Sequence, residues 1–279
     1  METKDKSSNC VIDETSARRL RVWFDDYIDT FDMQDKELSI NIALKREHTL
    51  RVCNEIAYIG KNLGLSETDL VIAEVLALFH DIGRFEQYRK YRTFVDSISV
   101  NHAEFGIEIL RENSVLTTLD SSTAEFILKV ISYHNRAYLP DGETPACLFF
   151  SRLLRDADKL DIWYVLTSYY SRSSEEKNRA IELDLPDTPG ISPGVYKGIM
   201  SHSVINHSLV RSLNDFKMLQ AAWVFDVNFQ PTFQRLYEKG YLDMIRDSIA
   251  ESKEIDDIFS MLRSCLEERI FLGNVSGLL

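Results

Sequence analysis

Apolar residues recur along most of the chain at intervals of three and four, the spacing of one face of an α-helix. The clearest run, residues 71–79, is apolar nearly throughout and is broken by Glu74. A helix of this composition is expected to be buried on almost every side. It ends in His80 and Asp81, which predicts that it meets a polar pocket, and Gly83 is expected to let the backbone turn sharply away.

The same helical spacing continues on both sides of this run. It predicts a long helix over about residues 38–63, closed by Gly64, and a capping box at residues 66–69 that opens the next helix. The period returns in three further segments, at residues 102–110, 126–134 and about 148–170. No alternating strand pattern exceeds about five residues, and no internal repeat is present. The predicted fold class is all-α.

Polar and loop-forming residues divide this pattern into four predicted parts. Residues 1–37 combine a helix with an acidic stretch, interpreted as a solvated face and linker. Residues 38–170 form the helical core. Residues 171–203 contain three prolines and three glycines, which predicts a loop-rich insertion of the kind that forms lids. Residues 204–279 are expected to be C-terminal helices packing on the core.

Composition and net charge limit the kinds of molecule that the protein is expected to bind. The chain has 279 residues, 44% of them hydrophobic, which is enough for a large core. Its net charge of −12 argues against binding to nucleic acid polymers or anionic membranes, but permits a small phosphorylated ligand in a locally positive cleft. The four cysteines are scattered, without CxxC spacing, so free thiols and a cytoplasmic location are expected. No signal peptide and no run near 18 apolar residues is found.

Four of the six histidines lie on the apolar faces of different predicted helices: His48, His80, His102 and His134. One such histidine is usually a hydrogen-bonded core residue, but four together with Asp81 and an aspartate from residues 156–161 supply enough ligands for two divalent metals. Imidazole with carboxylate suits Fe, Mn, Zn or Co better than Ca. Asp81, with two oxygens, is the natural bridge, and a hydroxide held between two metals would be a strong nucleophile.

His48, then His80-Asp81, then an aspartate in Asp156-Ala-Asp-Lys-Leu-Asp161 resemble the H…HD…D signature of the HD-domain metal-dependent phosphohydrolase superfamily. The resemblance covers about residues 38–170 and implies a helical bundle with one or two divalent metals, among Fe, Mn, Zn, Co and Mg. The extra histidines resemble its binuclear subset, which includes cyclic-dinucleotide phosphodiesterases. The implied metal ligands are His48, His80, Asp81, His102, His134 and Asp158.

Helical phase alone does not decide which aspartate is the last of these ligands. Asp156 shares a helix face with Phe149, Leu153 and Leu160, so it satisfies the phase equally well. The family pattern, an aspartate followed three residues later by a second acidic or polar residue, instead points to Asp158.

Basic residues near the signature are expected to meet the substrate. Residues 84–92 carry four cations against one anion, a net charge of +3. Arg84 and Arg92 from this segment are predicted to bind an anionic substrate, and Lys159 resembles the phosphate-contacting lysine of the deoxynucleotide triphosphohydrolase branch. The resemblance implies that Asp81, Arg84 and Lys159 are catalytic, the two cations neutralising charge on the phosphoryl oxygens.

The predicted function is a metal-dependent phosphohydrolase that acts on a nucleotide or another small phosphorylated metabolite. Cyclic dinucleotides fit less well, because the Gly-Tyr-Pro motif expected after His134 is missing. One alternative is a mixed-valent di-iron oxygenase, since the inositol and phosphonate-cleaving oxygenases of this superfamily resemble the chain in their two extra histidines. Another is a non-catalytic nucleotide-binding regulator. The C-terminal helices would complete the pocket, form a homodimer interface or stabilise the domain.

Overall fold

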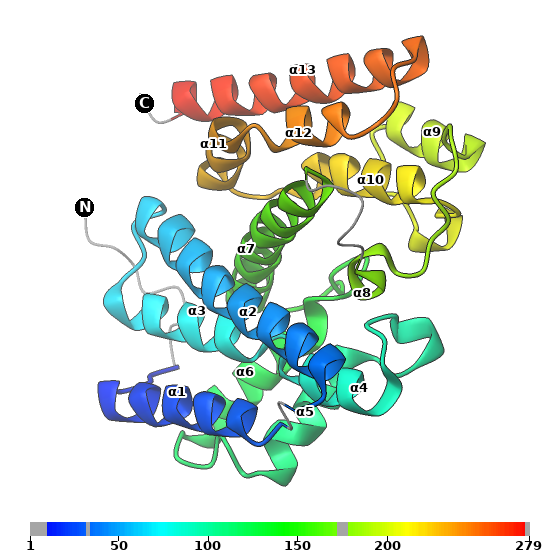
Figure 1. Ribbon diagram of the computed structural model, residues 1–279. Coiled ribbons are helices and arrows are strands. Elements are labelled where there is room, and N and C mark those ends of the chain that lie inside the picture. The colour runs from blue at the N-terminus through cyan, green and yellow to red at the C-terminus, as the bar shows by residue number, and fades with distance from the viewer. Residues whose placement is uncertain (1–9, 32–33, 172–177, 277–279) are drawn as a thin grey trace. The chain divides into compact units, whose positions relative to one another are not determined.

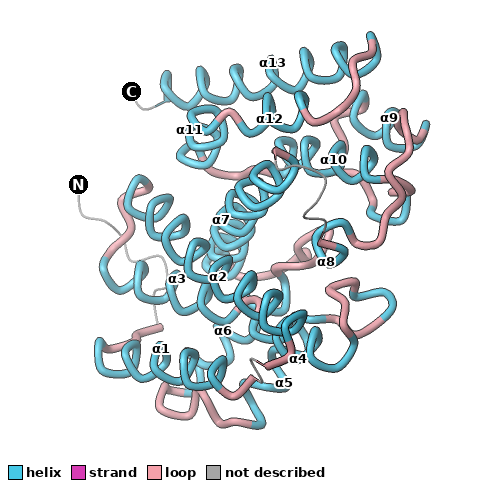
Figure 2. The backbone as a smooth tube through the Cα atoms, viewed as in Figure 1, coloured by secondary structure: helices cyan, strands magenta, loops and turns pink. Residues whose placement is uncertain are grey.

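The structure, a computed structural model, describes residues 10–31, 34–171 and 178–276. Within these residues the chain is helical, and Figure 2 shows helices joined by loops with no strand in the coloured parts of the tube. The predicted all-α fold is confirmed for them. The chain divides into two compact units, Met1–Asp161 (unit 1) and Ile162–Leu279 (unit 2). The division into four parts expected from the sequence stays a prediction.

Unit 1 is built from helices that pack around α3 (Figure 1). Its elements are α1 (Glu14–Asp29), α2 (Lys36–Asn62), α3 (Glu67–Phe79), α4 (Ile82–Tyr91), the short 3-10 helix η1 (Asp96–Ile98), α5 (His102–Glu112), α6 (Ser121–Tyr133) and the first part of α7 (Pro145–Tyr170), which continues into unit 2. The helix α3 packs on α1, α2 and α6, while α4 packs on α2 and α5. This arrangement surrounds the end of α3 with other helix ends.

The helix α3 is the buried element that the sequence predicts. Ser66 caps its start, where its hydroxyl accepts a hydrogen bond from the Asp69 amide at 3.1 Å. Ile72, Leu76 and Phe79 are fully buried. Burial of each large apolar side chain contributes about 2 kcal/mol, so this helix is a main source of unit 1 stability.

The helix α2 includes part of the predicted acidic linker. It starts at Lys36, two residues before the expected position, because the Asp35 side chain caps it by accepting from the Leu38 amide at 3.0 Å. It ends at Asn62, and Gly64 follows with a left-handed φ of 70°, as expected of a glycine that closes a helix. An aspartate of the acidic stretch is therefore a helix cap as well as a solvated charge.

The prediction of a sharp turn at Gly83 is wrong. Gly83 lies inside α4, and the bend between α3 and α4 falls at Asp81, with φ −105° and ψ 15°. A Cβ atom on Gly83 would collide with the carbonyl oxygen of His102 and lie 2.7 Å from the amide nitrogen of Gly106. Gly83 is needed because α4 and α5 approach each other too closely there for a side chain.

Unit 2 is also helical. Its described elements are the rest of α7, then α8 (Arg179–Glu182), α9 (Pro193–Met200), η2 (His207–Leu209), α10 (Leu213–Ala222), η3 (Trp223–Asp226), α11 (Gln230–Lys239), α12 (Tyr241–Asp247) and α13 (Lys253–Ser276). The helices α11 and α12 pack on α13, and α10 packs on α9. Between Val204 and Ser212 the only helical element is η2, and α10 begins at Leu213, capped by the Ser212 hydroxyl. The segment predicted to be loop-rich contains α8 and α9.

All four cysteines are free, as the sequence predicts. Across the described ranges, no helix combines the length and the apolar character needed to cross a bilayer.

Candidate metal centre

Six side chains that the sequence singles out come together inside unit 1. They form two groups of three, in each of which the potential ligand atoms lie within 4.8 Å of one another. Group A is His48, His80 and Asp158, and group B is Asp81, His102 and His134. All are buried except Asp158, which is partly exposed. Of the two aspartates left open by helical phase, the geometry favours Asp158 over Asp156.

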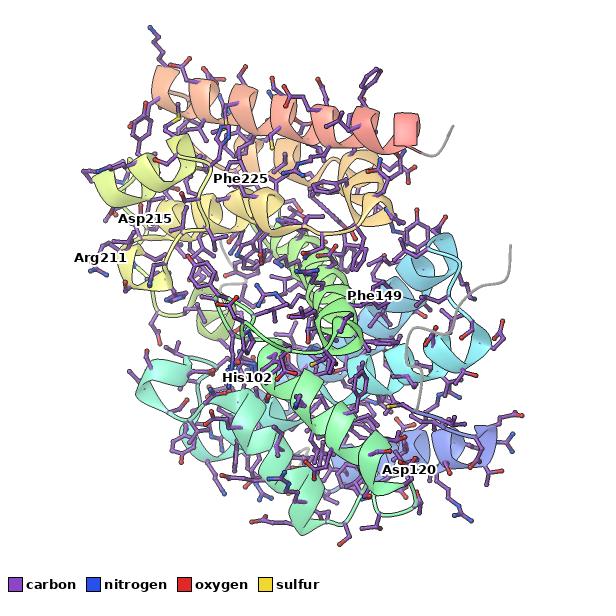
Figure 3. All side chains as sticks on the ribbon, turned by 180° about the vertical axis from the view of Figure 1, so that it is seen from behind. His102, Asp120, Phe149, Arg211, Asp215 and Phe225 are labelled. Atoms are coloured by element: carbon purple, nitrogen blue, oxygen red, sulfur yellow. The ribbon has the colours of Figure 1, made fainter. Side chains whose placement is uncertain are left out.

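Helix ends deliver four of these six side chains. His80 is the C-cap of α3, Asp81 the N-cap of α4, and His134 the C-cap of α6. His102, labelled in Figure 3, is the first residue of α5. His48 lies within α2 and Asp158 within α7. Because side chains at a helix end can extend beyond it, several helices can meet at one point without their backbones colliding.

Asp81 joins the two groups. Its Oδ2 atom lies 3.5 Å from His48 Nε2 and 3.7 Å from His80 Nε2, on the side of group A. Its Oδ1 atom lies 3.4 Å from His102 Nε2 and 3.6 Å from His134 Nε2, on the side of group B. One carboxylate oxygen therefore faces each group, the arrangement that a bridge between two metals requires.

In every histidine of the two groups, the Nδ1 atom is hydrogen-bonded to an oxygen. The pairs are His48 with Asp161 and His102 with Asp96, both at 2.6 Å, and His80 with the Ala77 carbonyl and His134 with the Ile131 carbonyl, both at 2.7 Å. A carbonyl only accepts, so Nδ1 of His80 and of His134 carries the proton. In a neutral ring this leaves a lone pair on Nε2, directed at the centre, as in metal-binding histidines.

Several buried atoms of the centre have no hydrogen-bond partner. These atoms are His48 Nε2, His80 Nε2 and Asp158 Oδ1. His48 Nε2 and Asp158 Oδ1 lie 3.2 Å apart and attract each other when His48 is protonated, whereas His80 Nε2 costs about 1–3 kcal/mol if nothing binds it. In group B, the Nε2 atoms of His102 and His134 lie 2.9 Å apart, so that two lone pairs face each other unless a proton or a cation lies between them. The orphaned atoms and this donor set fit divalent metals such as Fe, Mn, Zn or Co.

Together, burial and the charges around the two groups shift the pKa values of His48 and His102 in opposite directions. Burial and the Lys45 charge lower the pKa of His48, but the carboxylates of Asp158, Asp161 and Asp81 outweigh them and raise it to about 10. Burial and the charge of Arg84 lower the pKa of His102 to about 3. In the absence of metal, His48 is therefore protonated at neutral pH while His102 is neutral, and a metal entering group A displaces a proton.

The pKa values of the two carboxylate ligands are shifted by burial and by the charges around them. Burial raises the pKa of Asp81, but Lys45 and His80 hold it well below its ordinary value. Burial likewise raises the pKa of Asp158, but His48 and His80 outweigh that effect. Both side chains are thus ionised, as ligands must be.

Other contributors to the centre were not predicted from the sequence. Lys45 Nζ lies 2.7 Å from Asp81 Oδ2, and the available signal was its position one helical turn before His48. Asp161 belongs to the sequence motif, but nothing in the sequence marks it as the partner of His48 Nδ1; it also accepts from Arg51 Nε at 2.5 Å. Asp96 lies in η1, where no periodic pattern marks it.

A family comparison fits this geometry. The sequence model of the HD domain family matches residues 46–163. The chain contains an HD domain. The match includes all six side chains of groups A and B, and HD domains belong to a superfamily of metal-dependent hydrolases that bind divalent metals. Comparisons with curated proteins and with solved structures find no match.

Two of the three cations predicted to bind substrate are paired with carboxylates of unit 1. Arg84 Nη1 donates to Gln87, to the Phe94 carbonyl and to Asp96 at 2.5–2.8 Å. Arg92 pairs with Asp35 at 2.7 Å. The other two cations of the segment, Arg89 and Lys90, share Glu86, which the net charge of +3 already counts. The pairing of Arg84 with Asp96 and of Arg92 with Asp35 leaves a net charge of +1. Lys159 is buried in α7. Substrate roles for Arg84, Arg92 and Lys159 stay predictions.

The Asp96→Asn substitution should weaken metal binding in group B selectively. Asp96 accepts from His102 Nδ1 through Oδ2, and from Arg84 and Gln87 through Oδ1. Removing a carboxylate that orients a ligating histidine costs about 10- to 100-fold in metal affinity. Calorimetric titration with Mn²⁺ should show one weakened site and one unchanged site. Equal weakening of both sites would contradict the assignment of Asp96 to group B.

Proposed function

We propose that the HD domain of this chain is a metal-dependent phosphohydrolase, which cleaves a phosphate ester of a nucleotide or another small phosphorylated metabolite. The observation that carries the proposal is the position of Asp81, with one oxygen toward each group of ligands. Divalent metals held there would lower the pKa of a coordinated water toward neutrality and offset negative charge on a phosphoryl group. The six residues of groups A and B would hold them.

The charge balance of the centre favours an anionic substrate. Asp81 and Asp158 bring two negative charges to the ligand set. The carboxylates behind the histidines are balanced, since Asp161 pairs with Arg51 and Asp96 with Arg84. Two divalent ions would add four positive charges, and Lys45 beside Asp81 adds one more, so the centre would carry about +3 inside a protein of −12. Phosphorylated compounds fit this local field.

The residues around the ligands would hold the geometry and exclude water. The four imidazoles are fixed through Nδ1, so little side-chain freedom is lost when the centre is occupied. Arg84 Nε is a buried donor with no hydrogen-bond partner, 3.6 Å from Asp81 Oδ1. From this position it would donate to a phosphoryl oxygen that enters beside Asp81, while Arg84 Nη1 stays bound to Asp96.

Metal analysis and a substrate screen test the proposal. The purified protein should hold about two metals per chain, as two groups of ligands require. Phosphate release should be lost after treatment with a chelator and restored by Mn²⁺, in a screen of phosphomonoesters, nucleotides and phosphodiesters. One metal per chain would remove the two-metal centre. Two metals without turnover in any of these substrate classes would contradict the hydrolase.

The oxygenase alternative has an observation of its own. Group B is as completely built as group A, and four imidazoles with two carboxylates also suit a pair of iron ions. Oxygen consumption by partly oxidised iron protein, compared with phosphate release by the Mn²⁺-loaded protein, separates the two reactions. Binding of nucleotides without either reaction would favour the regulator instead.

A further inference from the structure

Lys45 places an ammonium group against the carboxylate that joins the two groups. Its Nζ lies 2.7 Å from Asp81 Oδ2, and its side chain is 17% exposed, so it stands between solvent and the buried ligands. The same oxygen faces His48 and His80 of group A. The match to the HD domain begins one residue later, at residue 46, so the family pattern assigns Lys45 no role.

Lys45 is held far less firmly than Arg84, the cation beside the other oxygen of Asp81. Arg84 is fixed by its hydrogen bonds to Gln87, Phe94 and Asp96. The contacts described for the Lys45 ammonium are the single ion pair with Asp81 and the ring of Phe94, whose centroid is 5.3 Å away. A lysine ammonium is a point charge on a flexible stem, so Lys45 can move away from Asp81 without breaking a network.

A divalent ion in group A and the Lys45 ammonium would both be drawn to Asp81 Oδ2. Positive charges a few ångströms apart repel strongly where water is scarce. We propose that Lys45 leaves Asp81 when group A is loaded, and that its ammonium then binds a phosphate oxygen of the substrate. The inference rests on the proposed function for the identity of this anion.

This role gives Lys45 opposite effects on the two binding steps. Before loading, its ammonium competes with the metal for Asp81, so its removal strengthens metal binding. After loading, the same ammonium attracts the anion, so its removal weakens phosphate binding. A lysine that merely positioned Asp81 would behave differently, because its loss would weaken both steps.

The test compares Lys45→Met with wild-type protein as full-length chains. After removal of metal, Mn²⁺ is titrated by calorimetry, and inorganic phosphate is then titrated into the Mn²⁺-loaded protein. In Lys45→Met, Mn²⁺ should bind on the order of tenfold more tightly and phosphate on the order of tenfold more weakly, the size expected for one charge-assisted contact. Lys45→Arg, which keeps the charge, should retain most of the phosphate affinity.

Lys61→Met is the matched control, since Lys61 is exposed near the other end of α2 and the change in net charge is the same. It should alter neither affinity. Lys45→Gln supplies a second neutral side chain if methionine disturbs the fold. Weaker Mn²⁺ binding, or unchanged phosphate binding, in the neutral variants overturns the inference. If wild-type protein binds Mn²⁺ but no phosphate, both the proposed function and the inference about Lys45 fail. If wild-type protein binds both and the variants behave like it, only the inference about Lys45 fails.

Discussion

Replacing Asp81 with asparagine should empty both halves of the metal centre and abolish phosphate release. The substitution keeps the size of the side chain but removes the charge that both groups share, Oδ2 toward group A and Oδ1 toward group B. A directly ligating carboxylate should cost more than the about 10- to 100-fold in affinity that supporting residues cost. Metal content by mass spectrometry should fall from about two ions per chain to near zero.

His134→Ala is the matched comparison for Asp81→Asn. His134 belongs to group B and lies 3.6 Å from Asp81 Oδ1, so its loss should remove one ion and leave the other. Circular dichroism should show that both variants remain helical, which separates loss of metal from loss of fold. An Asp81→Asn protein that kept two metals, or full turnover, would show that Asp81 is not the bridge.

Replacing Gly83 with alanine should disrupt group B although Gly83 carries no ligand atom. The added methyl group would meet the carbonyl oxygen of His102 and the amide of Gly106, both backbone atoms that cannot rotate away. The helices α4 and α5 must then separate, which should lower the free energy of unfolding by about 3 kcal/mol. Because His102 begins α5, the shift should also remove the metal of group B while group A keeps its ion.

Gly198→Ala is the control for this effect. Gly198 lies in α9 of unit 2, and the nearest atom to an added Cβ is Ile205 Cγ1 at an ordinary distance of 3.5 Å. Alanine is better than glycine in a helix by up to about 1 kcal/mol, so this variant should be as stable as wild-type protein or slightly more stable. Urea unfolding gives the stabilities, and metal content gives the state of group B. A Gly83→Ala protein with normal stability would contradict the close crossing of α4 and α5.

The core helix and most of the candidate ligands could be predicted from the sequence, because both depend on helical phase. The apolar residues of α3 specify burial on all sides, and each of His48, His102 and His134 shares a face with apolar neighbours of its own helix. A helix that buries such a face must bring its histidine inward. Convergence on a single point was an inference from number and from family resemblance, and the structure brings these side chains together.

Features that depend on contacts between distant segments could not be predicted in this way. Lys45 and Asp81 are 36 residues apart, and nothing in either helix alone indicates that they meet. Asp96 lies in a short 3-10 helix, so no period shows which way it points. The sequence predicts a turn at Gly83 because glycine permits unusual backbone angles, whereas the glycine is required by the approach of α5. That second reason for a glycine has no local signature.

The hydrogen bonds at the four Nδ1 atoms also affect whether the protein stays folded after it loses a metal ion and before it binds another. His80 and His134 each bond a carbonyl near the end of their own helix, and these bonds do not involve the side of the ring that faces the centre. The surrounding core, including Ile56 and Phe79, is apolar and needs no ion to hold it together. Small zinc domains unfold without their metal. This centre is instead expected to exchange its ions in the folded state, so that its content follows the metals available around it.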